Sequence, residues 1–84
     1  MRYQVIYTHR AERDLDKLDN ILRKRIGEKI LKMADNPFLY AERLSEPQIG
    51  SYRFRIGDYR VIFDIEENLL IILRIGHRKE IYRR

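Results

Sequence analysis

The stretch SYRFRIGDYRVIFDI, Ser51 to Ile65, decides the fold because it has the pattern of a complete β-hairpin. Apolar and charged residues alternate on both sides of Gly57-Asp58, which is the period-two pattern of half-buried strands. Gly57-Asp58 suits a two-residue hairpin turn, since glycine tolerates the positive φ that such a turn needs. Pairing across this turn sets apolar residues opposite one another, in the pairs Ile56–Tyr59, Phe54–Val61 and Tyr52–Phe63.

The same pairing brings like charges together on the other face of the hairpin. Arg55 lies directly opposite Arg60, and Arg53 is diagonal to both. Like charges placed opposite each other on a sheet are destabilising. Because broken local rules are expected at functional sites, the three arginines are candidates for a function.

The composition limits the protein to a few classes. The chain has 84 residues, 44% of them hydrophobic, which predicts one domain spanning residues 1–84 with a core of its own. It has no cysteine, and its two histidines lie far apart, so neither a disulfide framework nor a metal site is expected. No apolar run approaches a membrane span and no signal peptide is recognisable, which favours a cytoplasmic protein. No cofactor is expected.

Positive charge is concentrated toward the C-terminus. The net charge is +5, and residues 74–84 hold five Lys/Arg against one acidic residue, Glu80. Clustered basic residues are typical of a surface that binds a polyanion. The alternative is that a basic tail only aids solubility.

Helical patterns precede the hairpin. Arg2–Tyr7 is rich in β-branched and aromatic residues and predicts a first strand. Thr8 is suited to cap a helix with apolar residues at helical spacing, and Asp19 or Asn20 to cap a second helix that ends before Asn36-Pro37. The predicted inner faces are Ala11, Leu15 and Leu18 in the first helix, and Leu22, Ile26, Ile30, Met33 and Ala34 in the second.

The rest of the chain completes a sheet. The segment 38–50 is irregular, with Leu44 as its best candidate for a buried anchor. The strand Leu69–Ile75 is apolar at nearly every residue, which predicts a position inside the sheet with both faces covered. Gly76 is expected to end it before the last segment, HRKEIYRR. The sequence therefore predicts an α+β fold in the order β-α-α-β-β-β, with two N-terminal helices packed on an antiparallel sheet.

These elements and motifs resemble the RelE/ParE toxin superfamily of bacterial and archaeal toxin-antitoxin modules. The resemblance covers essentially the whole chain. It includes the Asp-Leu-x-x-Leu segment from Asp14 to Leu18, the hairpin YRFRIGDYRVIFDI, and the closing RIGHRKEIY. It implies a small RelE-like fold and a type II toxin held inactive by a RelB-like antitoxin, acidic and partly disordered when free.

The resemblance also implies a reaction. RelE-like members cut messenger RNA on the ribosome without a metal ion, by attack of the 2′-hydroxyl on the adjacent phosphorus. The implied catalytic residues here are Arg53, Arg55, Arg60, Arg78 and Tyr82, and the implied RNA-binding residues are His77, Lys79, Arg83 and Arg84. On this interpretation the arginine patch tolerates its own repulsion because it binds phosphate.

One departure from the family concerns the proton acceptor. Several relatives carry lysine where this chain has Arg53 and Arg55, and arginine effectively never loses its proton. Among the residues near the predicted site, only His77 is of a type that titrates near neutrality. If HRKEIY is extended, however, Arg78, Glu80 and Tyr82 share one face and His77 points the other way. The identity of the base is therefore left open.

Each residue has a structural alternative, and so does the function. Arg53 and Arg55 could only solvate an edge hairpin, Arg60 and Arg78 could pair with Asp64 or Glu80, and Tyr82 could cover the core. The functional alternatives are a ParE-like inhibitor of DNA gyrase and an RNA-binding module without chemistry. ParE-like members generally lack the full basic set with its terminal tyrosine, which favours the RNA-cleaving branch.

Overall fold

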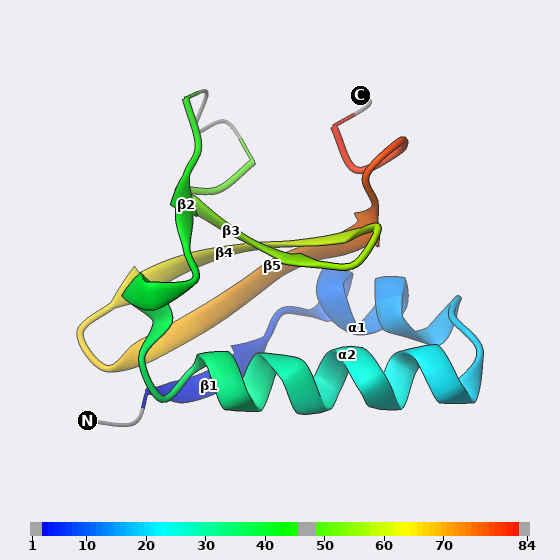
Figure 1. Cartoon of the computed structure of the whole chain (residues 1–84), viewed down its shortest axis with the longest axis horizontal. Helices are drawn as coiled ribbons and strands as arrows, with labels where there is room; N and C mark the ends of the chain where they lie inside the picture. Colours follow the sequence, from blue (N-terminus) through cyan, green and yellow to red (C-terminus); the bar gives the residue numbers. More distant parts are fainter. Residues whose placement is uncertain (1–2, 46–48, 83–84) are drawn as a thin grey trace.

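The protein has two layers, a sheet and a pair of helices that cover one of its faces (Figure 1). The computed structural model describes residues 3–45 and 49–82. The helices are α1 (His9–Asp16) and α2 (Asn20–Met33). The sheet is formed by β1 (Gln4–Tyr7), β2 (Glu42–Arg43), β3 (Tyr52–Ile56), β4 (Tyr59–Glu66) and β5 (Leu69–His77), in the order β1-β5-β4-β3-β2. The α+β class with helices on one face is confirmed.

The hairpin has the predicted register. The pairs Tyr52–Phe63, Phe54–Val61, Arg55–Arg60 and Ile56–Tyr59 all form between β3 and β4. Gly57 has a φ of 59° at the turn, which is the left-handed conformation that favours glycine. The sheet as a whole is mixed and not antiparallel as predicted, because β1 runs parallel to β5 while the other neighbours are antiparallel.

Three local predictions were wrong. Gly76 does not end the last strand, since β5 continues to His77. Leu44 is only half-buried, and its segment is held instead by the backbone bond from the Leu44 amide to the Ser51 carbonyl. A two-residue strand, β2, pairs with β3 where no strand was expected, and a 3-10 turn, Pro37–Leu39, precedes it.

Both helices begin at the expected caps. The Thr8 hydroxyl accepts a hydrogen bond from the Ala11 amide at 3.2 Å, and Asp19 Oδ1 accepts one from the Leu22 amide at 2.9 Å. Each cap satisfies one of the amides that a helix N-terminus leaves without a partner. The Thr8 hydroxyl also donates to the Ile72 carbonyl of β5 at 2.9 Å, which ties the start of α1 to the sheet.

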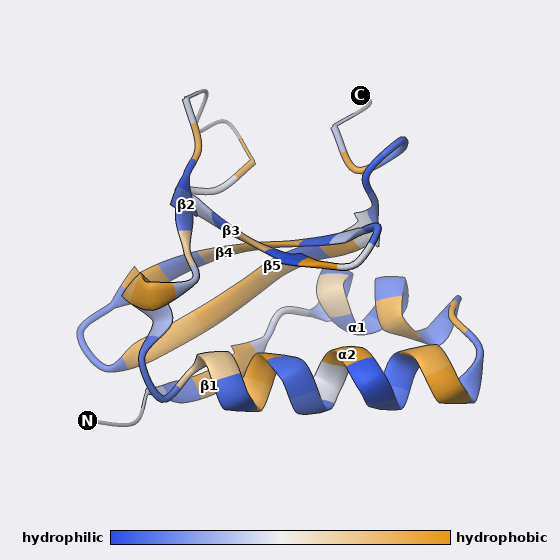
Figure 2. Cartoon of the chain, in the orientation of Figure 1, coloured by the Kyte–Doolittle hydropathy of each residue, from blue (hydrophilic) through white to orange (hydrophobic). Residues whose placement is uncertain are grey.

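The main core lies between the helices and the sheet, where hydrophobic segments of the two layers face each other (Figure 2). It contains Ile26 and Ile30 from α2, together with Phe54, Phe63 and Ile72 from the strands. No helix in the described part of the chain is long and apolar enough to cross a membrane. Fully buried apolar side chains thus fix the helical layer to one face and leave the opposite face of the sheet for other roles.

Asp14 joins α1 to the edge of the sheet. Strand β1 pairs with β5 only as far as Ile72, so the later amides of β5 need another partner. The buried carboxylate of Asp14 accepts hydrogen bonds from the Ile75 amide and from Arg74 Nε, both at 2.9 Å through Oδ2. Asp14 therefore supplies the hydrogen-bond acceptor that a neighbouring strand would otherwise provide at this edge.

We expect Asp14→Ala to lower the free energy of unfolding by about 2–3 kcal/mol, because a charged hydrogen-bond acceptor is lost and a buried amide is left without its partner. Urea denaturation followed by circular dichroism measures the loss. The matched control is Asp16→Ala, two residues along the same helix and exposed, with an expected change within about 0.5 kcal/mol. Equal stability of the two variants would contradict this role of Asp14.

Candidate functional site

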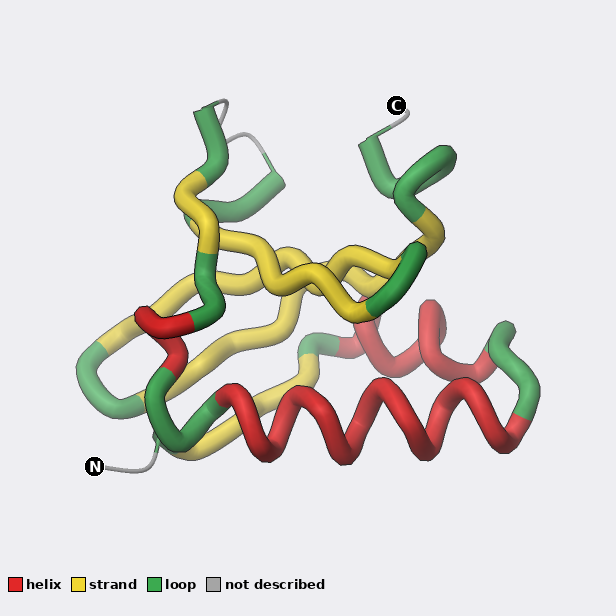
Figure 3. Tube along the Cα trace, viewed as in Figure 1, coloured by secondary structure: helices red, strands yellow, loops and turns green. Residues whose placement is uncertain are grey.

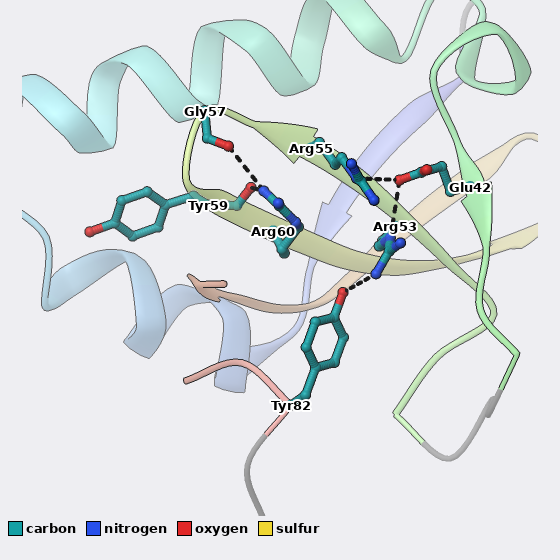
Figure 4. A network of polar contacts seen from close by, with 7 residues as sticks. All are labelled: Glu42, Arg53, Arg55, Gly57, Tyr59, Arg60 and Tyr82. Atoms are coloured by element: carbon teal, nitrogen blue, oxygen red, sulfur yellow. Dashed lines mark hydrogen bonds and ion pairs between the residues drawn. The ribbon is translucent and has the colours of Figure 1, made fainter. Parts of the chain in front are cut away.

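The candidate site lies on the face of the sheet that the helices leave uncovered. Tyr52, Phe54 and Ile56 of β3 point toward the helices, so the alternating residues Arg53 and Arg55 point away from them. Arg60 of β4 lies opposite Arg55 and shares its face. These three residues, here called the arginine face, are brought together as the sequence predicts (Figure 4).

Glu42 separates the arginine charges. It pairs with Arg53 across β2 and β3, and its Oε1 atom accepts a hydrogen bond from Arg53 Nε at 3.1 Å and forms an ion pair with Arg55 Nε at 2.7 Å. Figure 4 shows this single oxygen between the two guanidinium groups. The terminal amino groups of Arg55 remain available, and its side chain is 56% exposed. Glu42 therefore offsets the repulsion and leaves N–H donors for a ligand.

The ionisation of Glu42 follows from these contacts. Desolvation alone would raise the pKa of its carboxyl, but the hydrogen bond from Arg53 and the charges of Arg53 and Arg55 together hold that pKa below its ordinary value of 4.5. The carboxylate is thus ionised at neutral pH. Because the pKa of Glu42 is lower in the folded protein than in the unfolded chain, its ionised carboxylate stabilises the folded protein at every pH above the ordinary pKa. This stabilisation is lost as the pH falls through the pKa of the folded state.

Arg60 is held by the hairpin turn. Its Nη1 atom donates to the Gly57 carbonyl at 3.0 Å and to the Tyr59 carbonyl at 2.9 Å, and the residue is only 8% exposed. Its guanidinium group therefore diverges from that of Arg55, which turns toward Glu42 (Figure 4). Asp64, its sequence-based alternative partner, instead accepts from the Ser51 amide at 2.8 Å. Within the described residues Arg60 forms no ion pair.

We expect Arg60→Ala to destabilise the protein by about 1–3 kcal/mol, since two carbonyl groups lose a charged donor and the buried stem of the side chain is removed. The exposed Arg55→Ala should change stability by no more than about 0.5 kcal/mol. Thermal and urea unfolding of the two variants compare them directly. A stable Arg60→Ala protein would show that the turn bonds contribute little.

The C-terminal segment folds back onto the arginine face. Residues 78–82 form turns, so HRKEIY is not extended and the face shared by Arg78, Glu80 and Tyr82 in an extended segment does not apply (Figure 3). The Ile81 amide donates to the His77 carbonyl at 2.9 Å, and the buried Ile81 side chain packs on Gly76, where an added Cβ would lie 3.1 Å from Ile81 Cδ1. The absence of a side chain at Gly76 thus lets the turn approach the sheet.

Tyr82 reaches Arg53 because of this turn. Its hydroxyl oxygen accepts a hydrogen bond from Arg53 Nη1 at 2.6 Å, and the Arg53 guanidinium carbon lies 5.9 Å from the ring centroid. The hydrogen bond to Tyr82, against a smaller opposing effect of desolvation, raises the pKa of Arg53. With 43% of its surface exposed, Tyr82 does not serve as a cover for the core and presents its ring to solvent.

The other predicted residues lie around this site. Arg78 is tied by its amide to the Asp58 carbonyl at 2.8 Å, while its side chain is 55% exposed and only 3.8 Å from the Asp58 carboxylate. His77 lies against the Tyr59 ring on the helix side of the hairpin, away from the arginine face. Lys79 is exposed in the turn. Arg83 and Arg84 lie outside the described residues.

The sequence interpretation missed Glu42 and Ile81. A two-residue strand is too short to show a periodic pattern. A single Glu within the irregular segment 38–50 gives no sign that it pairs with arginines. Ile81 stood as one apolar residue in a polar tail, which is a weak indication of an anchor. Among the described residues, no group of three or more His, Cys, Asp or Glu side chains could hold a metal ion.

Comparison with known proteins gives consistent matches across nearly the whole chain. The sequence model of the ParE toxin of the type II toxin-antitoxin system parDE matches residues 5–82. Toxin RelG of Mycobacterium tuberculosis is 34% identical over 87 aligned residues that cover all of both chains. These matches include every described residue of the arginine face and the C-terminal turn.

Solved structures agree with the fold. A chain in the toxin-antitoxin complex RelBE2 from Mycobacterium tuberculosis superposes with a TM-score of 0.83 at 28% identity, covering 93% of this chain and 100% of that chain. A chain in the RelB-RelE antitoxin-toxin complex from Methanococcus jannaschii gives a TM-score of 0.70 at 26% identity, with 92% and 94% covered. Both relatives were solved bound to partners.

Proposed function

The chain belongs to the ParE toxin family of type II toxin-antitoxin systems, within the RelE/ParE superfamily, and from this premise we propose that it is a ribosome-dependent mRNA endonuclease. The observation that carries the proposal is the arginine face with Tyr82 folded against Arg53. The guanidinium groups of Arg53 and Arg55, the nearby charge of Arg60 and one exposed aromatic ring suit a phosphate and its adjoining base.

The chemistry requires stabilisation of negative charge. Attack of the 2′-hydroxyl on the adjacent phosphorus creates charge on the phosphoryl oxygens, and preorganised cations near those oxygens lower the barrier. Arg55 presents its terminal N–H groups to solvent, and the half-buried Arg53 and the nearly buried Arg60, which forms no ion pair with a described residue, add positive charge beside it. Arg78 is proposed to contact the scissile phosphate at the edge of this face. The reaction needs no metal ion in this scheme.

We propose a protein antitoxin as the regulatory partner. RelB–RelE complexes are known for two structural relatives. A net charge of +5 favours an acidic partner, and a partly disordered chain can wrap the exposed cations as it folds on binding. Since messenger RNA and ribosomes are the proposed targets, the proposed location of the toxin is the cytoplasm.

Brief expression in cells, followed by mapping of mRNA 5′ ends, tests the endonuclease. New 5′ ends within translated codons are expected for the native protein, and they should disappear when translation initiation is blocked. The double variant Arg53→Ala/Arg55→Ala serves as the inactive control, because the half-buried Arg53 and the exposed Arg55 lie on the face opposite the main core and their removal should leave the fold intact.

The same experiment tests the alternative that the protein inhibits DNA gyrase, which deserves a test because the matching family model is that of the ParE toxin. DNA damage with intact messenger RNA would overturn the endonuclease proposal and favour inhibition of gyrase. RNA binding without new 5′ ends or DNA damage would favour a module without chemistry. Neither result would change the family assignment.

A further inference from the structure

The proposed cleavage needs a group that takes the proton of the attacking 2′-hydroxyl. Arg53, Arg55 and Arg60 cannot do so, because a guanidinium group effectively never deprotonates in proteins. His77 is on the wrong side, since it packs against Tyr59 on the helix face and its Nδ1 accepts from the Lys79 amide at 3.1 Å. The three arginines and His77 therefore leave this step without a base.

The carboxylates near the arginine face are not equivalent. Asp64 is engaged by the Ser51 amide, and Asp58 lies in the hairpin turn beside Arg78. Among the carboxylates that the structure describes, only Glu42 pairs with Arg53 and Arg55, at 3.1 and 2.7 Å. Both contacts use Oε1, so Oε2 accepts no hydrogen bond from any described residue, and the side chain is 44% exposed.

We propose that Glu42 is the general base of the cleavage reaction, an inference that rests on the proposed endonuclease function. Its Oε1 atom is held against the Nε atoms of Arg53 and Arg55, and the exposed side chain of Arg55 keeps its terminal N–H groups for phosphate while Arg53 Nη1 donates to Tyr82. A phosphate bound by those groups lies beside the free Oε2 atom. The 2′-hydroxyl of the preceding ribose is attached only a few bonds from that phosphate.

The proton transfer balances as follows. Glu42 accepts the proton of the 2′-hydroxyl while the 2′-oxygen forms a bond to phosphorus. The bond from phosphorus to the 5′-oxygen breaks, its electron pair stays with that oxygen, and the oxygen takes a proton from water. The products are a 2′,3′-cyclic phosphate and a 5′-hydroxyl, and Glu42 then returns its proton to solvent.

Substrate binding makes Glu42 a better base. The charged groups that face it are Arg53 and Arg55 of β3, and Tyr82 lies one hydrogen bond beyond Arg53. A bound phosphate competes for the same cations and adds a negative charge nearby, and both effects raise the pKa of the carboxyl. General bases work best when their pKa approaches the operating pH.

Single-turnover cleavage on programmed ribosomes tests this role with Glu42→Gln, which keeps an acceptor oxygen for the two Nε groups but cannot take a proton. Cleavage should slow by about 10²–10⁴-fold, while binding of a short RNA should not weaken, because one negative charge is removed. In the pH–rate profile of the native protein, the rate should fall about tenfold per pH unit on the acidic side, where Glu42 becomes protonated. This acidic limb should be absent from the profile of Glu42→Gln. Glu66→Gln, an exposed change at the opposite turn of the sheet, is the matched control with native rates.

Two results would overturn the inference. Glu42→Gln protein that cleaves within about threefold of the native rate would show that the carboxylate only shields the arginines. Equal losses of RNA affinity and of rate, with the acidic limb retained, would make Glu42 a positioning residue. Absence of cleavage by the native protein would instead overturn the proposed function, and this inference with it, so the two failures are distinguishable.

Discussion

Arg78→Ala is expected to slow single-turnover cleavage by about 10²–10³-fold, the usual loss when one preorganised donor to a reacting phosphate is removed. Among the described residues this side chain has no strong partner, since the Asp58 carboxylate is 3.8 Å away. Its backbone, in contrast, is fixed by the hydrogen bond from its amide to the Asp58 carbonyl. The backbone of Arg78 is thus fixed, while its guanidinium group can reach a substrate.

The comparison of rate with binding identifies the step that Arg78 serves. RNA affinity should fall much less than the rate, because the charge acts mainly in the transition state. Arg78→Lys should recover little, since lysine cannot make two parallel hydrogen bonds to a phosphate. Lys17→Ala, which removes one exposed positive charge beside α1, is the control for net charge. Native rates in Arg78→Ala would remove the residue from the mechanism.

Local chemistry explains which parts of the fold could be predicted. The hairpin register follows from the alternation around Gly57-Asp58, and the helix starts follow from Thr8 and Asp19, because turn and cap preferences act between neighbouring residues. The place of β5 inside the sheet was predicted from its apolar composition. The parallel pairing of β1 with β5 was not, since either direction buries the same residues.

Tertiary contacts explain what the sequence could not predict at the site. Alternation alone placed Arg53 and Arg55 on one face, but nothing local indicates that Glu42 lies across from them or that Arg60 turns to two carbonyl groups. The C-terminal turn depends on the packing of Ile81 on Gly76, two residues that a periodic pattern treats as unrelated. The position of Tyr82 beside Arg53 therefore depends on this turn and not on a strand-like alternation of HRKEIY.

Tyr82→Ala is expected to slow cleavage by about five- to 150-fold, the loss that corresponds to a base–aromatic stacking energy of roughly 1–3 kcal/mol. The exposed ring beside Arg53 is available to a nucleotide base. Tyr82→Phe keeps the ring but removes the hydroxyl that accepts from Arg53 Nη1 at 2.6 Å. One such hydrogen bond corresponds to about a two- to twelvefold effect, so the Phe variant should lie between the native protein and Tyr82→Ala.

A double-mutant cycle of Tyr82→Ala with Arg53→Ala separates two roles of Tyr82, which are stacking of its ring on a base and the hydrogen bond of its hydroxyl to Arg53. If Tyr82 acts only through its hydrogen bond, removing Tyr82 should have no further effect once Arg53 is alanine, because the bond is already lost. If the ring stacks on a base, most of the Tyr82→Ala effect should persist in the Arg53→Ala background. We expect persistence, since the ring offers far more contact area than the hydroxyl. Native cleavage rates in Tyr82→Ala, or loss of its folded circular dichroism spectrum, would show that Tyr82 is not a substrate contact and that its role is structural.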